Sequence, residues 1–348
     1  MVRILAAALA LFCLMPVARA WEAAPLTAQQ AAHVLNRMSF GPRPGDIGRL
    51  QRMGLQAYVA EQLDPSRPDL LGETARRVHE LASARVDAGP DEADDLARQE
   101  RLLRAIASRR QLEEVLVGFW LQQKGEAGLG AAAQARMAQE LRPRVFAPYS
   151  GSDSPAAWCR ALADWFVGSA PPPLVARMEE AWRRSGGAQK EVLRALFTSP
   201  EFLAPAARSA KRKDPLRLLA SAVRGSGMEV ANAAPLAQAQ RKLEEQGMAA
   251  WPEVAAALAE GRLALAAEAP RRHRQASVAP PVRAVDQAGG PVSPAQVRPE
   301  APTPSAAAMA AATRTPPLGA QLMREALGLA ASKGAAVELL GSEEFLRY

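Results

Sequence analysis

Apolar residues recur three or four positions apart along most of this chain, and the strict apolar–polar alternation of a half-buried strand is missing. Alanine, leucine, arginine and glutamate, which are all good helix formers, dominate the same region. This pattern predicts an all-α fold in which amphipathic helices bury their apolar stripes against one another. We expect an irregular multi-helix bundle over residues 21–269.

Glycines, prolines and capping residues divide the helical region into segments. Thr27 precedes the first apolar stripe and is expected to cap a helix that runs to Met38, and Asp46 is expected to cap the next helix. The acidic run 89–95 is interpreted as a turn that opens a long segment, whose apolar stripe continues to Trp120. Other helices are expected over 55–63, 69–86, 131–141, 154–167, 172–184, 188–198, 214–224, 236–246 and 251–268.

The composition changes near the last quarter of the chain. Residues 270–317 contain ten of the 28 prolines and almost no aromatic residues. Such a segment cannot bury enough apolar surface to offset the entropy lost on ordering, so we expect a disordered Pro/Ala-rich linker. Helical patterning resumes over 318–348, and these two C-terminal helices are expected to dock on the main domain, because two short helices alone form a poor core.

The N-terminus has the organisation of a secretory signal peptide over residues 1–20. Arg3 supplies positive charge, fourteen apolar residues follow, and Ala18 and Ala20 are the small residues that signal peptidase requires. Cleavage is expected before Trp21. A membrane-spanning helix needs about 20 apolar residues, and no later segment provides them. We therefore predict an exported protein, periplasmic or extracellular, with no transmembrane segment after cleavage.

Charge and cysteine content exclude several classes of function. Signal removal lowers the net charge from +7 to +5, and the basic clusters 211–213 and 271–274 are short, so the dense basic face of a nucleic-acid-binding protein is missing. Cys159 is then the single cysteine, so no internal disulfide can form. It lies on an apolar helical stripe far from any histidine, which favours a buried thiol over a catalytic thiolate.

Two segments, 199–202 and 342–345, share the pattern Ser-x-Glu-Phe. A serine followed by an acidic residue is typical of a helix start, where the hydroxyl caps free N–H groups and the acid favours the positive end of the helix dipole. We expect the phenylalanine to anchor each turn in the core.

Several blocks in a fixed order resemble an exported bacterial family, domain of unknown function 1800. The N-terminal block His-Val-Leu-Asn-Arg-Met-Ser-Phe-Gly-Pro at 33–42 is the most specific part. The other similar blocks are 46–50, 55–63, 113–120, 140–143, 162–178, 193–202, 211–219 and 341–348. The chain is identified as a divergent, internally shortened member of this family, which has no settled biochemical activity.

The polar residues that could support catalysis in that family are absent here. The family continues Phe-Trp with Asn-His-Phe, but Phe119 and Trp120 are followed by Leu-Gln-Gln-Lys. The family's long polar central section is replaced after Pro143 by about twenty residues. If the family performs metal-assisted or acid–base chemistry, those residues are the natural candidates. The three histidines form no cluster with metal-ligand spacing, so we expect no metal, no cofactor and no catalytic residue.

His33, Asn36, Arg37 and Ser39 are the candidate ligand-binding residues. His33 and Arg37 are four positions apart on one helix and therefore share a face. They could bind an anionic group, with Asn36 or Ser39 adding hydrogen bonds. In the structural interpretation, which we favour, Arg37 bonds carbonyls of the 39–45 loop and His33 packs as a half-buried ring, because a lone histidine without partners is rarely catalytic.

Two functions remain open. The favoured one is an exported, non-catalytic helical scaffold or binding protein of the cell envelope, whose partner is an unknown envelope protein or polymer. This function is suggested because the chain has the apolar helix blocks of the family but lacks the family's polar central section. The alternative is a divergent hydrolase-like enzyme with a residual polar site near His33. The surroundings of His33 discriminate between them, because an enzyme needs an open polar cleft and a scaffold needs a packed helix junction.

Overall fold

The computed structural model describes residues 25–149, 151, 153–208, 210–266 and 333–348. Within these residues the regular structure is helical and contains no strand, apart from one isolated antiparallel bridge between Arg212 and Arg347. The predicted all-α class is therefore confirmed. None of the helices in these ranges combines the length and the apolar character needed to cross a membrane.

The helices follow one another through short connections. Those of the first half are α1 (Ala28–Met38), α2 (Asp46–Met53), α3 (Leu55–Gln62), α4 (Gly72–Asp87), α5 (Pro90–Ala107), α6 (Gln111–Gln123), η1 (Glu126–Gly128), α7 (Ala131–Leu141) and η2 (Arg142–Arg144). Those of the second half are α8 (Pro155–Val167), α9 (Pro172–Ser185), α10 (Gln189–Phe197), α11 (Pro200–Leu203), η3 (Pro205–Ala207), α12 (Pro215–Ser226), α13 (Ala234–Gln246), η4 (Gly247–Ala250), α14 (Trp251–Ala259), α17 (Lys333–Leu340) and α18 (Glu343–Leu346).

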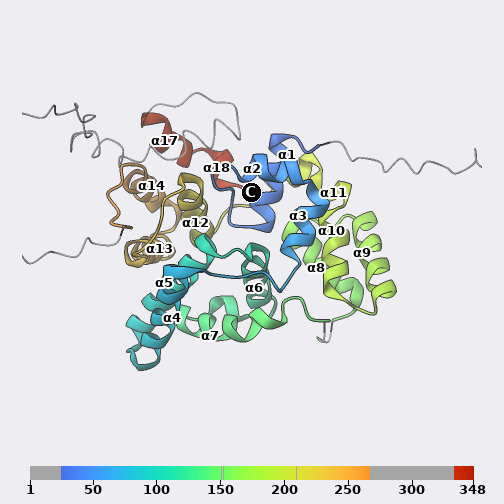
Figure 1. Cartoon of the computed structure of the whole chain (residues 1–348), viewed down its shortest axis with the longest axis horizontal. Helices are drawn as coiled ribbons and strands as arrows, with labels where there is room; N and C mark the ends of the chain where they lie inside the picture. Colours follow the sequence, from blue (N-terminus) through green and yellow to red (C-terminus); the bar gives the residue numbers. More distant parts are fainter. Residues whose placement is uncertain (1–24, 150, 152, 209, 267–332) are drawn as a thin grey trace, which may run out of the picture.

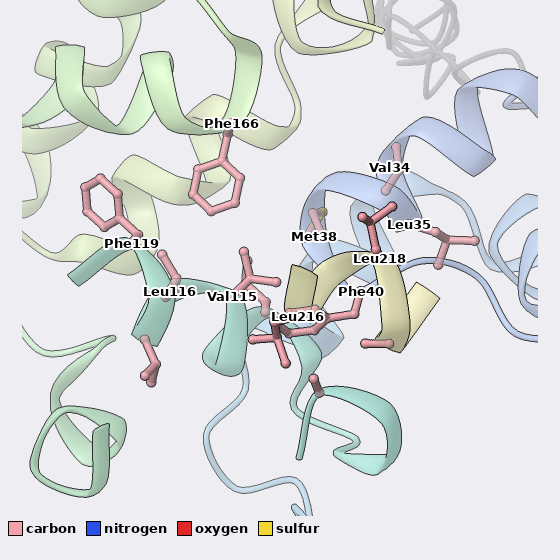
Figure 2. Packing of buried hydrophobic residues seen from close by; sticks show 14 of the residues in the cluster. Val34, Leu35, Met38, Phe40, Val115, Leu116, Phe119, Phe166, Leu216 and Leu218 are labelled. Atoms are coloured by element: carbon pink, nitrogen blue, oxygen red, sulfur yellow. The ribbon is translucent and has the colours of Figure 1, made fainter. Parts of the chain in front are cut away.

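One large apolar core connects helices that are far apart in the sequence (Figure 1). α5 packs against α4, α7, α12 and α13, while α9 packs against α8 and α10. α1 contacts α2, α6 and α11. Figure 2 shows Met38 of α1, Val115 of α6, Phe166 of α8 and Leu218 of α12 around this core. The N-terminal helix is thus a central part of the fold.

The acidic run that was predicted to be a turn is the first part of a helix. α5 begins at Pro90, and Asp91 and Glu92 occupy its first turn. Proline is tolerated there because its missing N–H would be unpaired anyway, and acidic side chains favour the positive end of the dipole. The long predicted segment is interrupted between α5 and α6. There the Ser108 hydroxyl accepts a hydrogen bond from the Arg110 N–H, and the helix ends.

Three other boundaries differ from the prediction. Asp46 does not cap α2; Gly45 occupies the cap in a left-handed conformation, and Asp46 accepts a hydrogen bond from the Arg43 N–H at 2.8 Å. α4 begins at Gly72 because Asp69 is bonded to the α5–α6 connection through the Arg109 N–H. α14 ends at Ala259, and the chain then turns through a glycine with a φ of +72° at 261.

Both Ser-x-Glu-Phe segments form capped helix starts, as predicted. The Ser199 hydroxyl accepts from the Phe202 N–H at 3.1 Å, and the Ser342 hydroxyl accepts from the Phe345 N–H at 3.2 Å. The Phe202 side chain is completely buried, and the Phe345 ring stacks on Trp251 with 6.0 Å between ring centres. The same short sequence therefore anchors two turns in the fold.

The C-terminal segment 333–348 lies against the body of the protein. α17 packs on α14, and the Trp251 Nε1–H donates to the Leu340 carbonyl at 2.6 Å. The chain then pairs with the segment before α12, where the Lys213 N–H donates to the Leu346 carbonyl at 2.9 Å. The predicted signal peptide with its cleavage site, the predicted linker 270–317 and the first part of the predicted 318–348 unit lie outside the described residues.

Candidate functional site

His33 and Arg37 lie on the face of α1 that packs against α11 and η3. The His33 side chain is 5% exposed, and its Nε2 donates to the Phe202 carbonyl over 2.7 Å. Arg37 is 1% exposed, and its Nη2 donates to the Ala207 carbonyl over 2.6 Å. The two side chains do share a face, as predicted, but that face is a packed helix junction. We call His33, Arg37, Phe202 and Ala207 the α1 junction.

The loop that follows α1 is held by arginines other than the predicted one. Arg37 extends toward Ala207, so the prediction that it bonds the loop carbonyls is wrong. Arg217 Nη1 donates to the Ser39 carbonyl at 2.8 Å, and Arg224 Nε donates to the Gly41 carbonyl at 2.7 Å. Arg217 and Arg224 are seven positions apart, which is two turns, so both emerge from the same face of α12.

Asn36 and Ser39 contribute to the end of α1. The Asn36 carbonyl accepts a second hydrogen bond from Arg217 Nη1 at 2.8 Å. Ser39 is completely buried, its hydroxyl donates to the Leu35 carbonyl, and the same oxygen accepts from the Gly41 N–H at 3.2 Å. Both residues therefore fix the helix end and the following turn.

The electrostatics of the α1 junction keep its histidine neutral. Burial and, to a lesser extent, the positive charge of Arg37 lower the pKa of His33 to about 4, although the hydrogen bond to Phe202 opposes this. Burial also lowers the pKa of Arg37 to about 10. At neutral pH the guanidinium is charged and the imidazole is not. A group with a pKa of about 4 is a weak general base at neutral pH.

Aromatic residues of the C-terminal segment cover the neighbouring cations. The Tyr348 ring centre lies 4.7 Å from the Arg37 guanidinium and 4.3 Å from that of Arg217. The Phe345 ring centre lies 3.8 Å from Lys213 Nζ, and burial lowers the pKa of this lysine to about 7. Cation–π attraction partly offsets the cost of burying positive charge. The C-terminal segment thus closes the junction on the side of α12.

A buried ion pair joins two of the blocks that carry the family resemblance. Arg142 donates to both carboxylate oxygens of Glu114, through Nε at 2.7 Å and Nη2 at 3.2 Å. The side chains are 12% and 4% exposed. Burial alone would raise the pKa of Glu114, but Arg142 and then Arg104 hold it below its usual value. The sequence does not predict this pair, because the two residues are 28 positions apart and no local pattern connects them.

A cavity of about 410 Å³, partly open to solvent, lies between α5, α6, α7, α8, α12 and α13. Its lining includes Arg101 of α5, Gly118 of α6 and Gln134 of α7, with apolar walls from Val115 and Leu216. We call it the Arg101 cavity. The sequence does not predict this cavity, since it is assembled from separate helices. The one local signal is Gly118, which places a residue without a side chain between large residues of α6.

Cys159 and the acidic residues give no indication of reactive chemistry. Cys159 is a free, completely buried thiol, and burial raises its pKa to about 12. This agrees with the predicted structural role, since a thiol at that pKa is protonated at neutral pH. Across the described ranges, no group of three or more His, Cys, Asp or Glu residues is arranged so that it could hold a metal ion.

Comparison with the sequence models of protein families gives a match. The sequence model of a family described as "Protein of unknown function (DUF1800)" matches residues 33–150 and 153–334 of this chain. No curated protein and no solved structure matches it significantly. The matched region starts at His33 and includes the α1 junction, the Glu114–Arg142 pair and the Arg101 cavity.

Proposed function

This chain belongs to the DUF1800 family, whose function is unknown, and we propose that it is an exported, non-catalytic helical binding protein of the cell envelope. Its partner would be an envelope protein, polymer or small molecule that it holds without converting. The N-terminal block supports a structural role, because His33, Arg37 and the Ser39 carbonyl form hydrogen bonds that connect α1 to α11, η3 and α12.

The observation that carries this proposal is the hydrogen bond from His33 Nε2 to the Phe202 carbonyl. A hydrolase that used His33 as a base would need this ring to face a substrate and to bind a proton near neutral pH. The ring is instead 5% exposed, and its pKa is lowered to about 4. No observation of the described residues favours the hydrolase-like alternative.

Assays of the purified mature protein test the proposal. We expect no hydrolysis of ester or glycan substrates above the buffer rate, and no difference between the wild type and the variant His33→Gln. The exposed His79, replaced by glutamine, is the matched control for loss of an imidazole. Turnover by the wild type that disappears in folded His33→Gln, but not in His79→Gln, would contradict the proposal.

Export is tested separately. Expression with the native N-terminus is expected to deliver a periplasmic or secreted protein that begins at Trp21. Retention of residues 1–20 in a cytoplasmic product would contradict the envelope part of the proposal, whatever the hydrolysis assays show.

A further inference from the structure

The charges that line the Arg101 cavity balance in number, but they are not all paired with one another. Six charged residues line it: Arg98, Arg101, Arg217, Glu114, Asp214 and Glu244. Two of the three acids have ion-pair partners. Glu244 pairs with Arg98 at 3.1 Å, and Glu114 pairs with Arg142, which lies outside the lining. Asp214 is used as the cap of α12, where it accepts from the Arg217 N–H at 2.7 Å.

The remaining cations are Arg217 and Arg101. Arg217 Nη1 donates to two carbonyls at the end of α1. Arg101 Nη1 donates to the Gln134 side chain at 3.2 Å, and Asp214, Glu114 and Glu244 act on its positive charge without forming an ion pair with it. Arg101, Arg217 and Asp214 are therefore the charged lining residues without an ion pair to a described residue. The positive and negative charges of the lining are equal in number, but Arg101 is not in direct contact with a described carboxylate.

Arg101 has both the chemistry and the space to bind an anion. A guanidinium presents five N–H donors in a planar fork, which matches a carboxylate in a bidentate arrangement. Arg101 uses Nη1 for Gln134. Its Nη2 is on the side of Gly118, because a Cβ built on that glycine would lie 3.7 Å from it. The missing side chain at Gly118 thus leaves room beside the guanidinium.

We propose that the Arg101 cavity binds a small organic carboxylate, whose anionic group pairs with Arg101 and whose apolar body packs on Val115, Leu121 and Leu216. This inference rests on the proposed binding function and specifies its ligand. The cavity volume lies within the range of small-molecule sites. A single negative charge fits best, because Arg101 offers one guanidinium without a direct carboxylate partner among the described residues, and the nearby Glu114 and Asp214 would repel a second negative charge.

Titration calorimetry of the mature protein tests the proposal with a series of straight-chain carboxylates from acetate to decanoate, together with phenylacetate. The neutral phenylacetamide and inorganic phosphate serve as comparison ligands. We expect at least one carboxylate to bind, and its neutral amide to bind roughly tenfold more weakly or worse, since a charged hydrogen-bond pair is lost. Phosphate is expected to bind more weakly than that carboxylate.

Variants identify the cavity as the site. Gly118→Leu places four carbons beside the Arg101 guanidinium and is expected to weaken carboxylate binding about tenfold or more. Gly118→Ala adds a Cβ at an ordinary van der Waals distance and is expected to keep the affinity within about threefold. Arg101→Met is expected to abolish the preference for the acid over the amide. Arg136→Met removes an exposed charge of α7 and is the matched control.

Several outcomes would overturn the carboxylate site. They are the absence of measurable binding by every carboxylate, equal affinity for phenylacetate and phenylacetamide, or unchanged affinity in folded Gly118→Leu. These outcomes leave the hydrolysis and export results untouched. Conversely, turnover that depends on His33 would overturn the non-catalytic function while carboxylate binding at Arg101 remained measurable, so the two failures are distinguishable.

Discussion

Replacing Arg142 with alanine is expected to lower the free energy of unfolding by about 3 kcal/mol at pH 7. The change leaves the Glu114 carboxylate buried without its bidentate partner, and removal of one member of a buried pair is much more costly than loss of an exposed pair. We place the effect at the lower end of that range, because Arg104 Nη1 still lies 3.7 Å from Glu114. Urea unfolding followed by circular dichroism measures it.

A surface pair provides the control for Arg142→Ala. Arg183 pairs with Glu180 on α9, with side chains that are 71% and 42% exposed, so Arg183→Ala is expected to change stability by less than about 0.5 kcal/mol. The double variant with Glu114→Leu and Arg142→Leu is expected to recover part of the loss, because neither charge of this pair is then left without the other. Equal, small effects of Arg142→Ala and Arg183→Ala would show that the Glu114–Arg142 pair does not stabilise the fold.

Replacing Arg217 with methionine is expected to lower the free energy of unfolding by about 3 kcal/mol or more and to loosen α1 and the C-terminal segment. The substitution removes two charged hydrogen bonds to carbonyls at the end of α1, each of which contributes about 1.5 kcal/mol or more. It also removes the cation that lies 4.3 Å from the Tyr348 ring centre. Hydrogen exchange is therefore expected to accelerate in α1 and in residues 341–348 together.

The neighbouring arginine separates this effect from a general loss of charge. Arg212 pairs with Glu343 at the surface, and its side chain is 61% exposed. Arg212→Met is expected to change stability by less than about 0.5 kcal/mol and to leave exchange in α1 unchanged. If Arg217→Met accelerated exchange only near α12, α1 and the C-terminal segment would not be coupled through Arg217.

Local sequence chemistry was sufficient for much of the fold. The apolar stripe of α1 is buried as expected, and both serines of the Ser-x-Glu-Phe segments cap helices. Such features depend on neighbours within one helical turn, which the sequence lists directly. The acidic run at the start of α5 was misassigned because acidic residues are common both in turns and in first helical turns.

The functional regions could not be predicted in the same way. Arg37 was expected to bond the nearby loop, but its partner is the Ala207 carbonyl, 170 positions away, while Arg217 reaches the loop from α12. Helix packing determines which carbonyl each arginine bonds, and this packing cannot be derived from a single sequence. The Arg101 cavity depends in the same way on six helices that meet in space.

The buried state of His33 has a consequence for acid stability. Its pKa is about 4 in the folded protein and about 6.5 in an unfolded chain, so the unfolded state takes up a proton first as the pH falls. The contribution of neutral His33 to the free energy of unfolding is therefore fully present above pH 6.5 and is lost as the pH falls toward 4. A pKa shift of this size corresponds to about 3 kcal/mol of unfolding free energy. We expect the free energy of unfolding to depend less on pH between 6.5 and 4 in His33→Gln than in the wild type.

The central claim is that the block beginning at His33 is a packed structural junction, and NMR titration of the His33 imidazole tests it most directly. The wild type and His33→Gln are compared between pH 3.5 and 8 to assign the signal, with His79→Gln as the second reference. We predict that the His33 ring stays neutral down to about pH 5 and titrates near 4, because it is buried and bonded to the Phe202 carbonyl. Titration near 6.5 or above would mean that the ring is open to water or to a ligand, and would contradict this account.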